Sequence, residues 1–152
     1  MSTEDPTNME GERITRDEQH SIAAVPQTPL DEVLHRMNSL GRFRAAVLAS
    51  TEGLPIATAC SHGDPDVTAA MVALLRTVSK EAREQLGMGE LDEVTIQVRD
   101  RTRLVCRCFA ADGEELILAV IVEPDGYYRS ATAWAMREID ATWNPQRKRR
   151  RY

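Results

Sequence analysis

Short apolar segments joined by tight turns leave this 152-residue chain few ways to fold. One pair of segments, at 42–50 and 54–60, flanks a turn that contains Glu52 and Gly53. Glycine tolerates the positive φ that such a turn requires. Three more segments, at 93–99, 103–110 and 115–122, are separated by "DRT" and "ADGE". Strands joined by turns this short must run antiparallel.

Helical patterns precede, separate and follow these two groups of strands. The first helix begins after Thr28, a good N-cap residue, and ends at Gly41. Further helices are predicted over 66–86 and 127–143. The segment at 115–122 is apolar throughout, which predicts a central strand, whereas Pro55 predicts an edge strand at 54–60. We therefore expect the order α-β-β-α-β-β-β-α, with a five-stranded antiparallel sheet and helices on both faces.

The predicted helix at 66–86 is about 30 Å long and has apolar residues on two faces. The broader face is expected to cover the sheet, and it comprises Val67, Ala70, Met71, Leu74, Leu75, Val78, Ala82 and Leu86. The opposite face carries Ala69, Val72 and Ala73, followed by Arg76, Lys80 and Arg83. We expect Ala69, Val72, Ala73 and Arg76 to form an interface with a second copy. The alternative is that this face forms no interface: the alanines simply favour a helix, and the basic side chains simply lie on a solvent-exposed surface.

Charge is distributed unevenly along the chain, whose net charge is -5. Residues 1–27 are acidic and lack periodicity, so we expect a disordered extension before a domain at 28–143. The tail at 144–152, "NPQRKRRRY", is basic. On an acidic chain we expect this tail to be solvated, with neither nucleic acid nor stable membrane association. Because no signal peptide or membrane-spanning segment is found, a cytoplasmic location is predicted.

Sequence signatures of catalysis are missing, so we expect no enzyme activity, no catalytic residues and no cofactor. Cys60, His62, Cys106 and Cys108 are spaced as C-x-H and C-x-C, which does not fit a zinc site, and no metal is expected. The cysteines are predicted to stay reduced and to act as small hydrophobic residues. Trp134 is expected to pack against the first helix rather than to bind a partner.

Three stretches of the chain resemble the Roadblock/dynein light-chain domain family. They are "RFRAAVLASTEGLPIATA", "LGMGELDEVTIQ" and "ELILAVIVEPDG", within a matching region from about residue 30 to 143. The resemblance implies a profilin-like α/β sandwich. It also implies dimers that join the long helices and the third-strand edges into one continuous sheet. Bacterial members similar to MglB act on small Ras-like GTPases as activating proteins or co-regulators, with no catalytic site of their own.

The function expected from the sequence is therefore that of a non-catalytic homodimeric adaptor that regulates a small Ras-like GTPase. Lys80 and Arg83 are the candidate contacts to the GTPase. One alternative is a pure assembly scaffold without effect on GTP hydrolysis. A less favoured alternative is a small-molecule sensor, which should contain a cavity lined by polar residues.

Overall fold

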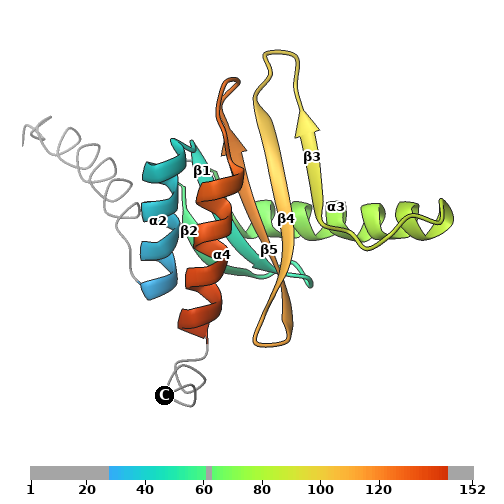
Figure 1. Cartoon of the computed structure of the whole chain (residues 1–152), viewed down its shortest axis with the longest axis horizontal. Coiled ribbons are helices and arrows are strands. Elements are labelled where there is room, and N and C mark those ends of the chain that lie inside the picture. Colours follow the sequence, from blue (N-terminus) through green and yellow to red (C-terminus); the bar gives the residue numbers. More distant parts are fainter. Residues whose placement is uncertain (1–27, 61–62, 144–152) are drawn as a thin grey trace, which may run out of the picture.

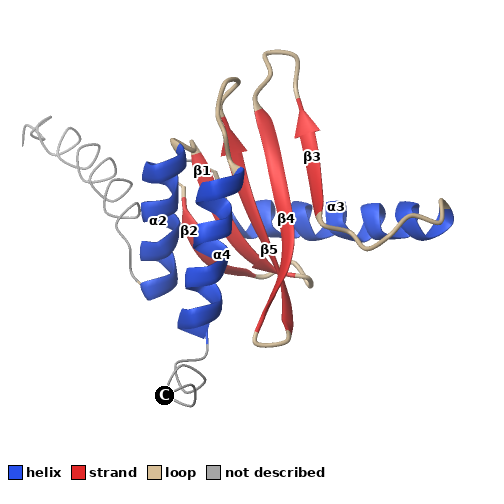
Figure 2. Ribbon diagram, in the orientation of Figure 1, coloured by secondary structure: helices blue, strands red, loops and turns tan. Residues whose placement is uncertain are grey.

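The computed structural model describes residues 28–60 and 63–143, and it has the predicted order of elements (Figures 1 and 2). The acidic extension and the basic tail lie outside the described residues. The elements are α2 (Pro29–Gly41), β1 (Ala45–Ser50), β2 (Pro55–Ala59), α3 (Pro65–Gln85), β3 (Glu93–Gln97), β4 (Arg103–Ala111), β5 (Glu114–Val122) and α4 (Arg129–Trp143).

The five strands form one antiparallel sheet in the order β2-β1-β5-β4-β3. The apolar strand β5 lies in the centre, and β2, which begins at Pro55, lies at an edge, so both predictions are confirmed. Strand β3 forms the other edge. Figure 1 shows α2 and α4 side by side on one face of the sheet and α3 crossing the other face.

The layer formed by α2 and α4 contains the larger apolar core. Leu34 and Met37 of α2 and Ile139 of α4 are fully buried against the sheet. Trp134 packs at the margin of this core, with the Arg36 guanidinium 5.4 Å from its ring centre. The predicted packing of Trp134 against the first helix is confirmed.

The layer formed by α3 corrects the predicted orientation of this helix. Ala69, Val72 and Ala73 are at most 7% exposed and pack against the sheet. They are therefore not available for a dimer interface, which was their predicted role. Small side chains allow the helix to lie close to the sheet and to the β1–β2 turn. A Cβ on Gly53, whose φ is +93°, would lie 3.2 Å from the Cα of Ala70.

Candidate self-association surface and basic pocket

The outward face of α3 carries a stripe of large apolar side chains. The residues of this α3 stripe are Val67, Met71, Leu74 and Val78, and each is between 54% and 63% exposed. Their separations of four, three and four residues place them along one side of the helix. This is the spacing at which one helix packs along another. A row of exposed apolar side chains of this size indicates a surface that binds another protein.

The two edges of the sheet differ in how their backbone groups are used. Along β2, the Thr58 amide donates to Asp31 Oδ1 at 2.9 Å, and Asn38 Nδ2 donates to the Ala59 carbonyl at 2.9 Å. Side chains of α2 thus occupy this edge. Strand β3 pairs with β4 alone, and within the described part of the chain its outer edge has no equivalent cover. Among the residues that the structure describes, the β3 edge therefore offers more free backbone groups for pairing with another strand than the β2 edge does.

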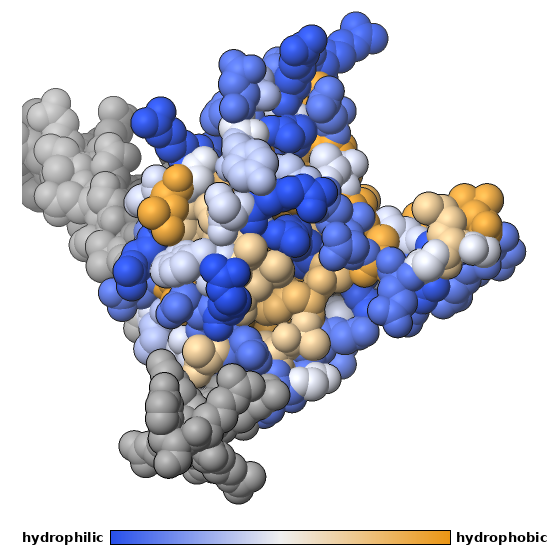
Figure 3. Space-filling model, in the orientation of Figure 1, coloured by the Kyte–Doolittle hydropathy of each residue, from blue (hydrophilic) through white to orange (hydrophobic). Residues whose placement is uncertain are grey.

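Further apolar side chains are exposed near this open edge and at the end of α3. Ile96 on β3 and Val98 just after it are 40% and 53% exposed. The C-terminal end of α3 projects beyond the sheet, where Leu86 and Met88 are exposed. Figure 3 shows hydrophobic side chains at this projecting end. The exposed apolar surface thus extends past the α3 stripe to the C-terminal end of α3 and to the β3 edge.

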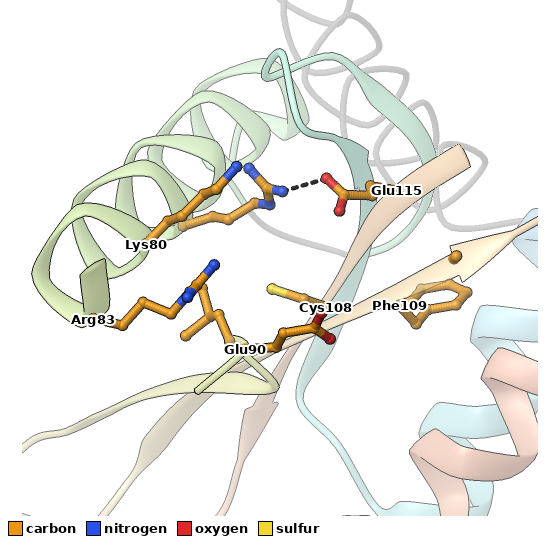
Figure 4. Close-up of a pocket in the computed structure, with 9 residues that line it drawn as sticks. Lys80, Arg83, Glu90, Cys108, Phe109 and Glu115 are labelled. Carbon is orange, nitrogen blue, oxygen red and sulfur yellow. Dashed lines mark hydrogen bonds and ion pairs between the residues drawn. The ribbon is translucent and has the colours of Figure 1, made fainter. Parts of the chain in front are cut away.

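The basic residues of α3 lie on its inner side, in line with Ala69, Val72 and Ala73. Arg76, Lys80 and Arg83 line a pocket of about 300 Å³ between the second half of α3, the loop before β3 and the end of β4. The other lining residues are Glu90, Leu91, Cys108, Phe109, Ala110 and Glu115. In Figure 4, Lys80, Arg83 and Cys108 point toward this space, whereas the Phe109 ring points away from it. Helix α3 thus separates the basic pocket from the apolar stripe.

Arg76 belongs to this pocket and not to the outward face, which corrects its predicted place in a dimer interface. Its side chain is 14% exposed, and its guanidinium donates to the Glu115 carboxylate. Lys80 and Arg83, the candidate GTPase contacts, are brought together at the same pocket. No hydrogen bond or ion pair is found for Lys80 in the part of the chain that the structure describes. The Nε–H group of Arg83 is buried without a hydrogen-bond acceptor.

The three cysteines are free thiols in apolar or half-buried surroundings. Burial raises the pKa of Cys106 to about 12. Burial also raises the pKa of the Cys108 thiol, an effect that the nearby Arg76 guanidinium opposes. Among the residues described here, no three His, Cys, Asp or Glu side chains form a metal-binding group. His62, which the sequence placed among possible ligands, lies outside the described residues.

The pocket could not be predicted from the sequence, because its lining residues come from separate parts of the chain. The sequence pattern places the bases at 76, 80 and 83 on one face of the helix, as the structure does, but it predicts that this face lies outside.

Among the helices that the structure describes, none is both long enough and apolar enough to cross a membrane.

A five-stranded antiparallel sheet with one long helix on one face and two helices on the other defines a profilin-like α/β sandwich. Residues 29–122 match the Roadblock/LC7 domain. The chain belongs to the Roadblock/LC7 domain family. No curated protein sequence matches the chain.

Solved structures share this fold along most of the chain. MglB from Myxococcus xanthus has a TM-score of 0.66 and 16% identity, over 77% of this chain and 96% of that one. A Roadblock/LC7 domain from Streptomyces avermitilis has a TM-score of 0.61 and 23% identity, over 78% and 98%. An MglB with a tetrameric arrangement has a TM-score of 0.59 and 19% identity, over 78% and 90%.

Proposed function

We propose that this chain is a non-catalytic adaptor that forms a symmetric homodimer and regulates a small Ras-like GTPase. The observation that carries the proposal is the α3 stripe beside an open sheet edge in a Roadblock/LC7 domain. Burying about 100 Å² of apolar surface contributes about 2.5 kcal/mol. Four large side chains left in water on one helix therefore favour association with a second apolar surface.

A second copy of the chain fits the arrangement of these features. In a two-fold symmetric pair, the α3 stripe of one subunit meets the same stripe of the other. The β3 edges could then pair with each other, which would satisfy the free backbone groups of both strands. The self-association of a structural relative, the MglB with a tetrameric arrangement, supports this choice.

Regulation of a GTPase is the finer part of the proposal, and it rests on the resemblance to MglB-like regulators. Such a regulator must bind the triphosphate and diphosphate states of the GTPase with different affinities. Lys80 and Arg83 are our proposed contacts. Lys80 is exposed and Arg83 is half-buried at the pocket, so an acidic side chain of the GTPase would have to reach the pocket mouth to pair with both.

Binding to a small Ras-like GTPase from the same organism tests the GTPase proposal. The GTPase is loaded with GDP or with a non-hydrolysable GTP analogue and captured on the immobilised chain. We expect stronger capture in one nucleotide state, and loss of capture with Lys80→Glu combined with Arg83→Glu. Arg137→Glu on α4, an exposed base in the other helical layer, is the matched control.

Two results would contradict the proposal in different ways. Equal capture in both nucleotide states would contradict a regulatory role and would favour the alternative of an assembly scaffold. Unchanged capture by the Lys80 and Arg83 double variant would remove these residues as the contacts. Raising the salt concentration should weaken capture, because exposed charge pairs are screened.

A further inference from the structure

We propose that the basic pocket beneath α3 binds a small organic anion with a carboxylate or phosphate head group. The site exists within one chain, so the proposal does not depend on dimer formation or on a GTPase. The pocket volume of about 300 Å³ lies at the lower end of the range for small-molecule sites, about 300–1,000 Å³.

The charge of the pocket favours an anion. Arg76, Lys80 and Arg83 supply three positive charges, and Glu90 and Glu115 supply two negative charges. Only the Arg76–Glu115 pair is joined directly across the pocket (Figure 4). Among the lining side chains one positive charge remains in excess, which favours a ligand with a negative charge.

The Arg83 guanidinium has few partners for a side chain that is largely buried. Its side chain is 25% exposed, and its nearest carboxylate oxygen, on the adjacent Glu84, is 4.0 Å away. Its buried Nε–H has no acceptor. Buried donors are satisfied in most proteins, and an exception calls for an explanation such as strain, a functional role, or a bound water or ion. A carboxylate or phosphate oxygen between Lys80 and the outer Nη groups of Arg83 would accept from both side chains and offset the guanidinium charge.

The rest of the pocket suits the organic part of such a ligand. Leu91, Ala110 and the Cys108 thiol provide a small apolar wall next to the bases. The Cys108 side chain points into the same space in Figure 4. A bound ligand would therefore cover this thiol, which makes Cys108 a direct reporter of occupancy.

Alkylation of Cys108 in the full-length chain, followed by peptide mass analysis, tests the proposal. The probes are benzoate and phenyl phosphate, and benzyl alcohol is the uncharged control of similar size. At about ten times Kd, an anionic probe leaves about one pocket in eleven open, so Cys108 alkylation should slow about tenfold. Cys60, which lies at the end of β2 and outside the pocket, is the internal control and should react at an unchanged rate.

Variants separate ligand binding from folding. Lys80→Ala should weaken the affinity for the protecting probe about tenfold, because one charge-assisted hydrogen bond is lost. Arg83→Met should abolish protection without lowering the resistance of the free chain to urea, since it removes a buried donor that has no acceptor. Arg137→Ala should leave protection unchanged.

Failure of both anionic probes to protect Cys108 would overturn the proposal. Equal protection by benzyl alcohol would also overturn it, because the charge would then have no role. A loss of urea resistance in Arg83→Met as large as a core truncation would show that Arg83 stabilises the fold, and this too would contradict the assignment. Each of these results is obtained without a GTPase, so it is independent of the proposed regulatory function.

Discussion

Asp31 stabilises two elements at once through its two carboxylate oxygens. Oδ2 accepts from the Thr28 amide at 3.2 Å and completes the capping box of α2, while Oδ1 accepts from the Thr58 amide on the edge of β2. The capping box could be predicted from "TPLD", because it involves neighbours in the sequence. The contact to β2 could not, since it joins residues 27 positions apart.

Asp31→Ala is predicted to lower the free energy of unfolding by about 1–2 kcal/mol, because the helix cap and the edge hydrogen bond are lost together. The neighbouring Glu32→Ala removes the same charge from an exposed position and is the control. Urea unfolding measures both. Equal effects of the two substitutions would show that only the charge near the helix N-terminus matters.

Tyr128 connects the start of α4 to the β3 edge strand. Its hydroxyl donates to Glu93 Oε1 at 2.6 Å, and this hydrogen bond is the main reason that the pKa of Tyr128 is raised. A raised pKa means that the folded chain favours the protonated phenol. The resulting stabilisation is fully present below the pKa of the unfolded chain, about 10, and is lost as pH rises through the folded-state pKa.

Tyr128→Phe should therefore reduce stability by about 1 kcal/mol at pH 8, where the hydrogen bond is present. The difference between wild type and variant should shrink as pH rises above 10. Urea unfolding at several pH values measures the difference. A gap between the two proteins that stays constant up to the highest pH would contradict the role assigned to this hydrogen bond.

At the scale of elements, local patterns predicted the helices and strands and failed on the orientation of α3. Turn residues and periodicity depend on neighbours in the sequence, so the element order, the β2 edge and the central β5 followed from them. The rule that larger apolar residues face the sheet did not hold for Met71 and Leu74. Close packing of α3 on the sheet requires small residues such as Ala69, and large apolar residues can face outward when a second protein covers them.

Val72→Ala and Val78→Ala place the same truncation on opposite faces of α3. Val72 is 1% exposed, so its truncation leaves a cavity and should cost about 2 kcal/mol. Val78 is mostly exposed, so its truncation should lower the free energy of unfolding of one subunit only slightly. Both are measured by urea unfolding in a Leu74→Glu background, so that self-association does not contribute. A larger loss of stability for Val78→Ala than for Val72→Ala would contradict the observed orientation of α3 and support the one expected from the sequence.

At the scale of the whole molecule, the two edges and the two faces of the sheet differ in how far they are covered. Asp31 and Asn38 close the β2 edge, and α2 and α4 cover one face of the sheet. The open β3 edge and the α3 stripe lie at the surface that the proposed homodimer would use. The basic pocket could not be predicted, because α3, the loop before β3 and the end of β4 meet only in the folded chain.

Sedimentation equilibrium of the wild-type chain and of Leu74→Glu tests the proposed dimer most directly. We expect the wild type at tens of micromolar to have twice the 17.0 kDa mass of one chain. Leu74→Glu should sediment as a monomer with unchanged circular dichroism, since it puts a charge into the interface and leaves the core intact. Arg137→Glu is the control and should remain dimeric. A monomeric wild type, or a Leu74→Glu variant that still dimerises, would contradict the account.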